Sequence, residues 1–363
     1  MKSKVIHISV RADMGGGPRH IQYLLEVIKE KVDCYVACPD DDPFYQVFCS
    51  MLGQDKVIVI PHRKVSAESV KAVRAFVKKH GITLVHCHGK GASVYGKVLK
   101  VTNPGTKVVY TPHGIHISEY SRLVKAVYIG YEKLTAFLFD RIIYVSESES
   151  ELAKSVGLFR RRPSVVVPNG VPDRSSSRSY DVAASKRQVF GSDSGPTVLT
   201  FSRFDFQKNM SEALAIAARL PQYNFLWLGY GDDFDALKEK AEAQQISNVF
   251  MLGARNDVGE YLAMGDVYLS TSRWEGMPLS LLEAMSYGIP IVASDVTGNR
   301  DVVSSQSGFL YPLGNIETAA GDIQKILENK QVSRDDVKEH FTRNYSSDTM
   351  AGKVLTIYKE ISL

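Results

Sequence analysis

Short apolar runs recur along the first half of the chain, and segments with helical spacing separate them. The runs lie at 5–8, 34–37, 57–60, 84–86, 108–110, 142–145 and 165–167. Helical patterns fall between them, for example at 19–31, 67–80 and 121–138. Strands that are apolar throughout and alternate with helices are typical of a parallel sheet covered on both faces. The pattern predicts a doubly wound α/β domain over residues 1–170.

The same pattern begins again after a change of composition. Residues 171–195 contain Pro172, a Ser/Arg-rich run and a short segment bounded by glycines, which is typical of a linker or hinge. Apolar runs then return at 197–201, 225–228, 249–252, 267–270 and 289–293. They predict a second doubly wound domain over 196–344. The last segment, 345–363, has Met350, Val354, Ile357 and Ile361 on one helical face and predicts a terminal helix.

Composition limits the class and location of the protein. Hydrophobic residues make up 44% and charged residues 23%, as in ordinary globular proteins. The first residues lead directly into a predicted strand without the apolar region of a signal peptide, and no apolar run reaches the roughly 18 residues that span a bilayer. The four cysteines lack zinc-like spacing and are interpreted as free thiols in a reducing cytosol. We expect a cytoplasmic protein, with peripheral attachment to the inner face of the cell membrane left open.

Charge is distributed unevenly between the two halves. Residues 1–170 hold 25 Lys and Arg against 15 Asp and Glu, a net of +10, whereas the remainder holds 19 against 25, a net of −6. A basic first half favours an anionic partner, such as phospholipid headgroups or a phosphorylated acceptor, although a solvated lysine-rich surface gives the same count. Nucleic acid is a poorer candidate, because neither interleaved aromatic residues nor a recognition motif accompanies the charge.

The segment 274–285 combines a helix start with two acids. It follows the predicted strand at 267–270, and Pro278 suits the first position of a helix. Glu275 precedes that helix and Glu283 lies within it. Free amides at a helix N-terminus attract an anion, and carboxylates accept hydrogen bonds from sugar hydroxyls. A single acid here would be an ordinary surface residue, but the arrangement as a whole suits a nucleotide-sugar.

Other candidate groups follow predicted strands. Arg203 and Lys208 come after the strand at 197–201, where two cations could hold a diphosphate. Gly15, Gly16 and Gly17 open a helix after the first strand, but they do not form the G-x-G-x-x-G pattern of a dinucleotide site. The segment 86–88, His-Cys-His, ends a predicted strand and is interpreted as strand-end residues rather than a metal site.

The motif E-x7-E at Glu275 and Glu283, followed by A-M-x-x-G-x-P-I-V-A-S, resembles the signature of retaining glycosyltransferase family 4. The R-x4-K-N motif that begins at Arg203 is also typical of that family. The resemblance implies the GT-B fold: two Rossmann-like doubly wound domains that face each other, a donor between them, and a C-terminal helix that crosses back to the first domain.

The resemblance also implies roles for particular residues. Arg203 and Lys208 would contact the leaving diphosphate, Glu275 the sugar hydroxyls and Glu283 the ribose. His113 matches the family histidine at the donor sugar, and Arg255 a position beside the nucleobase. The implied catalytic residues are His113, Arg203, Lys208 and Glu275, and the implied donor-binding residues are Gly16, Gly17, Gly229, Gly231, Arg255, Gly276, Met277, Pro278, Leu279 and Glu283.

The implied reaction moves a sugar from a UDP- or GDP-linked donor to a saccharide or lipid-linked saccharide, with retention at the anomeric carbon. No D-x-D metal motif stands out, and in this fold cations and helix dipoles usually replace the metal, so no metal or other cofactor is expected. Two alternatives remain: a nucleotide-sugar 2-epimerase of the same fold, and a nucleotide-sugar-binding protein without catalysis. The presence of both R-x4-K-N and E-x7-E favours the transferase.

The acceptor is harder to predict. Residues 121–139 are both apolar and basic, and Arg160, Arg161 and Arg162 follow. Such a segment suits an anionic membrane surface, which would favour a polyprenyl-diphosphate-linked saccharide as acceptor, as in bacterial lipopolysaccharide, capsule or exopolysaccharide synthesis. An ordinary core helix would explain the same pattern equally well.

Overall fold

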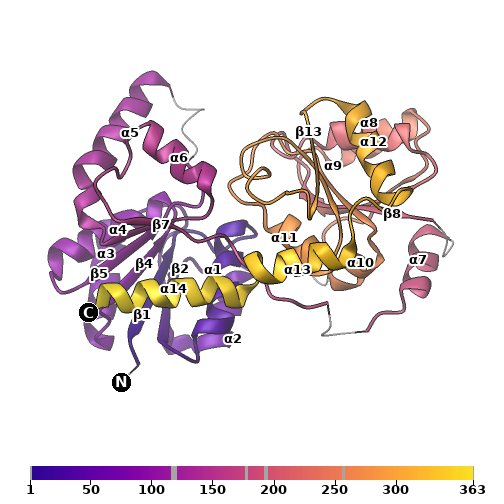
Figure 1. Cartoon of the computed structure of the whole chain (residues 1–363). Coiled ribbons are helices and arrows are strands. Elements are labelled where there is room, and N and C mark those ends of the chain that lie inside the picture. Colours follow the sequence, from indigo (N-terminus) through magenta and orange to yellow (C-terminus); the bar gives the residue numbers. More distant parts are fainter. Residues whose placement is uncertain (1, 116–120, 176–178, 192–194, 256–257, 363) are drawn as a thin grey trace. The chain divides into compact units, whose positions relative to one another are not determined.

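The structure is a computed structural model of the chain and describes residues 2–115, 121–175, 179–191, 195–255 and 258–362. These residues form two compact units, each built on its own sheet (Figure 1). The first unit comprises residues 1–170 and 347–363, and the second comprises 171–346.

The first unit contains a seven-stranded parallel sheet in the order β3-β2-β1-β4-β5-β6-β7. Its strands are β1 (Lys4–Ser9), β2 (Asp33–Cys38), β3 (Val57–Val59), β4 (Leu84–His88), β5 (Lys107–Thr111), β6 (Arg141–Tyr144) and β7 (Ser164–Val166). Its helices are α1 (Gly16–Ile28), α2 (Phe44–Leu52), α3 (Ala67–His80), α4 (Lys90–Thr102), α5 (Arg122–Thr135), α6 (Glu147–Ser155) and α14 (Ser347–Ser362), with short 3-10 turns η1 (Gln54–Lys56) and η2 (Ala136–Leu138).

Helix α14 joins the last residues of the chain to this first sheet. It packs against α1, and its apolar face buries Met350, Val354 and Ile357, while Ile361 is half-buried (Figure 1). The Tyr358 hydroxyl on the same helix hydrogen-bonds to His86 Nδ1 at 2.6 Å. The predicted terminal helix therefore completes the core of the first unit.

The second unit contains a six-stranded parallel sheet in the order β10-β9-β8-β11-β12-β13. Its strands are β8 (Thr197–Arg203), β9 (Asn224–Tyr230), β10 (Val249–Met251), β11 (Val267–Ser270), β12 (Ile291–Ser294) and β13 (Gly308–Tyr311). Its helices are α7 (Val182–Phe190), α8 (Met210–Arg219), α9 (Phe234–Ala243), α10 (Gly259–Met264), α11 (Leu279–Ser286), α12 (Ile316–Leu327) and α13 (Arg334–Tyr345). Helix α7 lies within 171–195, the predicted linker, and packs against α10.

The order of strands locates the functional edge of each sheet. In the first sheet β1 lies between β2 and β4, and in the second β8 lies between β9 and β11. At such a switch point the connections leave in opposite directions, so a crevice opens at the carboxyl ends of the strands. The segments that follow β1, β4, β5, β8 and β11 are therefore positioned to carry chemistry. None of the described helices is long and apolar enough to cross a bilayer.

Candidate functional site

A cation and a carboxylate meet at the carboxyl edge of the second sheet. Lys208 lies between β8 and α8, and its Nζ donates to Glu275 Oε1 at 2.5 Å. Ser272 Oγ, just after β11, donates to the same oxygen at 2.6 Å. The Lys208 and Glu275 side chains are only 18% and 8% exposed, so solvent screens this contact weakly. An ammonium has three N–H donors, which leaves Lys208 able to contact an anion as well as Glu275.

Local hydrogen bonds hold the Lys208 backbone in place. Asp205 Oδ1 accepts from the Lys208 backbone N–H at 3.0 Å, and the Thr271 hydroxyl donates to the Lys208 carbonyl at 2.9 Å. Asn209 then adopts a left-handed conformation, with φ of 53°, immediately before α8. Short polar side chains such as these favour turns, because they hydrogen-bond to nearby backbone groups. The sequence thus builds a fixed turn under the lysine.

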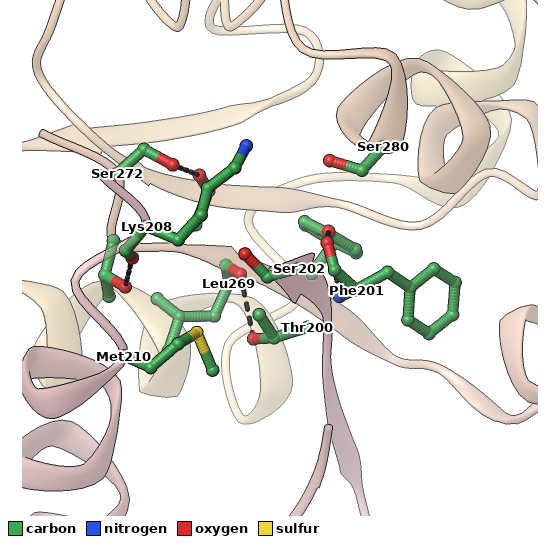
Figure 2. Close-up of a pocket in the computed structure, with 11 residues that line it drawn as sticks. Thr200, Phe201, Ser202, Lys208, Met210, Leu269, Ser272 and Ser280 are labelled. Carbon is green, nitrogen blue, oxygen red and sulfur yellow. Dashed lines mark hydrogen bonds between the residues drawn. The ribbon is translucent and has the colours of Figure 1, made fainter. Parts of the chain in front are cut away.

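A small cavity lies beside Lys208 at the ends of β8 and β11 (Figure 2). Its polar lining includes Lys208 and the hydroxyl-bearing residues Thr200, Ser202, Tyr268, Ser270, Thr271, Ser272 and Ser280. Thr200 Oγ1 donates to the Leu269 carbonyl at 2.9 Å, which joins the two strands at this point. With a volume of about 10 Å³ the cavity holds about one water molecule and is too small to enclose a phosphate.

Arg203 and Lys208 are not equivalent, although sequence analysis treats them as a pair. Arg203 is the last residue of β8, and its side chain is 51% exposed. Its Nη2 lies 3.2 Å from Asp205 Oδ2 and donates to Gln207 Oε1 at 3.2 Å. Gln207 in turn donates to the Trp274 carbonyl at 2.9 Å, next to Glu275. The structure therefore brings Lys208 into contact with Glu275 and places Arg203 in a network one step away.

Glycines allow the backbone to approach closely around this site. Gly229 and Gly231 have φ of +147° and +153°, and a Cβ on Gly229 would lie 1.7 Å from the Ser202 carbonyl oxygen. Gly298 has φ of +88°, and a Cβ there would lie 2.7 Å from backbone atoms of Glu275. The neighbouring Thr297 carbonyl accepts from the Glu275 N–H at 3.0 Å. The loop after β12 thus supports Glu275, a contact that the sequence does not signal.

The helix start predicted after Glu275 is present, with a shift of one residue. Pro278 is the N-cap, with ψ of 111°, and α11 begins at Leu279. Gly276 and Met277 form the connection, and Met277 is buried. Glu283 lies in the second turn of α11 and is half-buried, whereas Arg255 lies in an exposed loop after β10.

In the first unit, Gly16 and Gly17 are the first residues of α1, and an added Cβ on either would meet no atom within 4 Å. His113 follows β5 with φ of 56° and is half-buried. Glu149, which sequence analysis missed, supports this loop: its carboxylate accepts from the backbone N–H groups of Gly114, at 2.5 Å, and Val145, at 2.9 Å. Because Glu149 is distant in sequence, only the fold reveals this contact.

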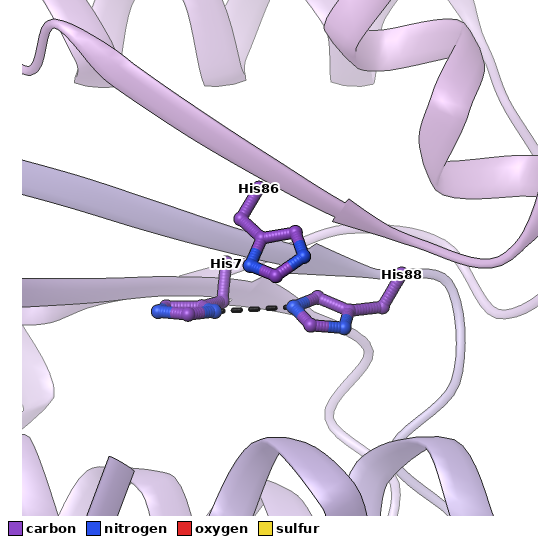
Figure 3. A group of neighbouring side chains, drawn as sticks. All are labelled: His7, His86 and His88. Carbon is purple, nitrogen blue, oxygen red and sulfur yellow. Dashed lines mark hydrogen bonds between the residues drawn. The ribbon is translucent and has the colours of Figure 1, made fainter. Parts of the chain in front are cut away.

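His113 belongs to a cluster of imidazoles with His7, His20, His86 and His88 (Figure 3 shows three of them). Burial lowers the pKa of His7 to about 3 and that of His20 to about 4, and it holds the pKa of each of the others well below the ordinary value. These rings are therefore neutral at physiological pH.

Two groups within the cluster have nitrogens close enough together for a metal: His7, His86 and His88, and His20, His88 and His113. Hydrogen bonds within the protein already account for several of those nitrogens. Both nitrogens of His86 are bonded, one to Tyr358 and one to Thr111, and His20 Nδ1 lies 2.9 Å from Asn169 Oδ1. The segment 86–88 does end a strand, as the sequence indicates.

Solved structures with the same architecture define the fold class. The Anabaena protein Alr3699/HepE, crystallised with UDP and glucose, superposes with a TM-score of 0.84 at 19% identity, covering 99% of this chain and 100% of that one. Sucrose-phosphate synthase from Thermosynechococcus elongatus gives 0.81 at 20% identity, covering 99% of each chain. Together with the two parallel Rossmann-like sheets, these likenesses define a GT-B fold.

Family comparisons then identify the chain more narrowly. Residues 14–174 match the model described as Glycosyltransferase Family 4, and residues 182–344 match the one described as Glycosyl transferases group 1. The chain therefore belongs to glycosyltransferase family 4 and is a retaining glycosyltransferase. This confirms the family, fold class and enzyme class predicted from the sequence.

Two of the curated relatives are bacterial glycosyltransferases. The Escherichia coli UDP-Gal:alpha-D-GlcNAc-diphosphoundecaprenol alpha-1,3-galactosyltransferase is 24% identical over 91% of this chain and 89% of its own. The Campylobacter jejuni N,N'-diacetylbacillosaminyl-diphospho-undecaprenol alpha-1,3-N-acetylgalactosaminyltransferase is 27% identical over 66% of each.

Proposed function

We propose that the chain transfers a sugar from a UDP-sugar to a saccharide carried on a polyprenyl diphosphate, in cell-surface polysaccharide synthesis. The contact between Lys208 and Glu275 carries this proposal, because a cation that can bind a diphosphate lies beside a carboxylate that can accept from sugar hydroxyls. The relatives support the choice of substrates: one uses UDP-Gal and a diphosphoundecaprenol-linked acceptor, and HepE was crystallised with UDP and glucose.

The proposed chemistry follows the movement of charge. As the bond from the anomeric carbon to the diphosphate oxygen breaks, negative charge grows on the diphosphate and positive charge on the sugar ring. Lys208 donates to the diphosphate, helped by Arg203 and by the backbone N–H groups of Gly276, Met277 and Leu279, since Pro278 has none. Glu275 accepts from sugar hydroxyls and holds the ring in position. The acceptor hydroxyl attacks the same face, and its proton passes to the departing phosphate oxygen, which retains the anomeric configuration.

The remaining predicted contacts complete the donor site. In this proposal Glu283 binds the ribose, Arg255 lies beside the uracil, and His113 contacts the donor sugar. Gly16 and Gly17 contact the diphosphate through their backbone, and Gly229 and Gly231 keep the end of β9 close to β8. Protein cations and helix amides take the place of a metal, so we propose that transfer needs no divalent ion.

The test is an assay with labelled UDP-sugars and an undecaprenyl-diphosphate saccharide, with EDTA in a parallel reaction. We expect a glycosylated lipid whose new linkage has the anomeric configuration of the donor, formed equally well in EDTA. A reaction without acceptor tests the epimerase alternative, which would release a free epimerised sugar. Binding of UDP with no product from any donor and acceptor pair would instead favour the non-catalytic alternative.

We also propose that helix α5 rests on an anionic membrane surface. Leu123, Val127, Tyr131 and Leu134 are spaced i, i+4, i+8 and i+11, so they lie on one side of the helix, and all four are exposed. The opposite side contains Glu132, which is buried and accepts from Lys97 Nζ at 2.9 Å. The segment 121–139 packs against the core through Tyr128, Ile129, Ala136 and Phe139, as a core helix would, but the apolar side chains of this stripe are exposed.

The charge of α5 and the chemistry of the proposed acceptor favour a membrane as the partner of the exposed apolar side of this helix. Arg122 and Lys133 are exposed on the same helix, and each basic residue near an anionic surface adds about 1 kcal/mol. A polyprenyl acceptor is itself embedded in the bilayer, so a transferase that uses it gains from resting there. A short amphipathic helix suits attachment to the surface rather than insertion across it.

Vesicle flotation tests this surface. The double variant Leu123→Glu, Leu134→Glu should lose binding to vesicles that contain phosphatidylglycerol. Val101→Glu is the matched control, because Val101 is also an exposed apolar side chain but lies on α4. Equal binding by both variants, or no binding of the unmodified protein at low salt, would contradict the proposal.

A further inference from the structure

Three of the clustered histidines form a continuous hydrogen-bonded chain that ends at His113. His7 Nδ1 on β1 lies 3.1 Å from His88 Nε2 at the end of β4 (Figure 3). His88 Nδ1 lies 3.0 Å from His113 Nε2. His88 therefore uses both of its ring nitrogens to connect a fully buried ring with a half-buried one.

Counting protons shows what this chain does to His113. Each neutral ring has one N–H, and each of the two contacts needs one proton between its nitrogens. The third proton then belongs to one end of the chain, either at His7 Nε2 or at His113 Nδ1. In the first case His113 Nε2–H donates to His88, and in the second His88 Nδ1–H donates to His113.

The surroundings of His7 decide between these two arrangements. Its Nε2 is buried and has no hydrogen-bond partner among the residues that the structure describes. A proton there would be an unpaired buried N–H, which is rarer in proteins and less favourable than an unused acceptor. Burial lowers the pKa of His7 to about 3 and those of His88 and His113 well below the ordinary value, so no additional proton enters the chain near neutral pH.

We propose that His7 and His88 are positioning residues that hold His113 as the neutral Nδ1–H tautomer, so that its free N–H donates to an oxygen of the donor sugar. The inference rests on the proposed contact of His113 with that sugar. A neutral donor suits the position, since a cationic imidazolium would repel the positive charge that develops on the ring during transfer.

Nitrogen NMR of the full-length protein tests the tautomer directly. Long-range proton–nitrogen correlation on ¹⁵N-histidine protein, with His113 assigned through its loss in His113→Gln, should show His113 protonated at Nδ1 and bare at Nε2. An Nε2–H tautomer in the unmodified protein would overturn the proposal, and this measurement depends on neither a folded positioning variant nor turnover.

Replacement of His7 tests the cause. In His7→Met the buried sulfur accepts but does not donate, so His88 should turn its proton toward position 7 and His113 should shift to Nε2–H. We expect kcat/KM to fall about tenfold with that shift, because the transition state loses the one hydrogen bond from His113 Nδ1–H to the donor sugar. His86→Met is the matched control, because His86 is paired with His7 in register and equally buried but lies outside the chain.

The two variants separate a positioning role from a packing role. His86→Met should keep His113 as Nδ1–H, and an unchanged His113 tautomer in folded His7→Met would contradict the proposal. Turnover of His113→Ala tests the other premise: normal turnover would remove the sugar contact, whereas the NMR spectrum decides the tautomer on its own.

Discussion

Lys208 is the residue on which the proposed chemistry depends most. Lys208→Ala should lower kcat by about 10²–10³, because it removes one fixed donor from the departing diphosphate. Lys238→Ala on α9, which removes an equally long but exposed lysine of the same unit, should leave kcat unchanged. Steady-state rates with circular dichroism of both variants provide the check. Near-normal turnover in folded Lys208→Ala would contradict the assignment.

Gly298 should matter for both stability and activity. Alanine at a left-handed position costs about 1–2 kcal/mol. At Gly298 the new Cβ would also collide with the Glu275 backbone, so we expect a further loss of stability and a displaced carboxylate with low activity.

Gly314 is the matched position for that experiment. Its φ is +86°, close to the +88° of Gly298, but an added Cβ would meet nothing within 4 Å. Gly314→Ala should therefore lose only the stability that a left-handed alanine costs, about 1–2 kcal/mol, and should keep full turnover. Denaturant unfolding and kinetics of the two variants measure the difference, and equal turnover in both would mean that Gly298 does not support Glu275.

The parts of the candidate site that depend on residue type and on spacing within the sequence could be predicted. Lys208 and Glu275 follow strands that sequence patterns reveal, so their meeting at one sheet edge follows from the topology. The support from Gly298, Ser272 and Glu149 was not predictable, since it depends on how closely separate loops approach. The roles given to the site residues stay predictions, those of Lys208 and Glu275 included.

At the scale of elements, strands buried on both faces gave strong signals. The runs at 5–8, 84–86 and 267–270 correspond to β1, β4 and β11, whereas β13 (Gly308–Tyr311) was not predicted, because Gly308 begins a short strand that is only partly buried. For α5, apolar spacing indicated a helix but not which apolar residues would be buried. Tyr128 and Ile129 pack against the core beside the buried Glu132–Lys97 pair, whereas Leu123 and Leu134 are exposed, and the sequence does not distinguish these two sets.

The imidazole cluster makes the first unit sensitive to acid. In the unfolded chain these histidines regain a pKa near the ordinary 6.5, above the values of about 3 for His7 and about 4 for His20 in the folded protein. The unfolded state thus binds more protons as pH falls from 6.5 toward 4, so folding stability is present above this window and is lost within it. Within this window, each such histidine lowers the free energy of unfolding by about 1.4 kcal/mol for every unit by which the pH falls.

Two spectroscopic signals can locate that loss. Both tryptophans, Trp227 and Trp274, lie in the second unit, so their fluorescence reports on that unit alone. On acidification we expect helical circular dichroism to fall before tryptophan fluorescence changes. His20→Gln should weaken the pH dependence of the circular dichroism signal. His62→Gln changes a more exposed histidine and should leave that dependence unchanged. Simultaneous loss of both signals would contradict an acid sensitivity that is greatest in the first unit.

At the scale of the whole molecule, the same fluorescence signal can test where the donor nucleotide binds. A ligand that binds only the folded state raises stability by about 2.7 kcal/mol when its free concentration is about 100 times Kd. We expect UDP to raise the denaturation midpoint followed by tryptophan fluorescence, and to do so more than GDP. Lys208→Ala should reduce the shift, because the diphosphate loses a cation, and Lys238→Ala should preserve it. A larger shift with GDP would contradict the choice of uridine, and no shift with either nucleotide would contradict a donor site in the second unit.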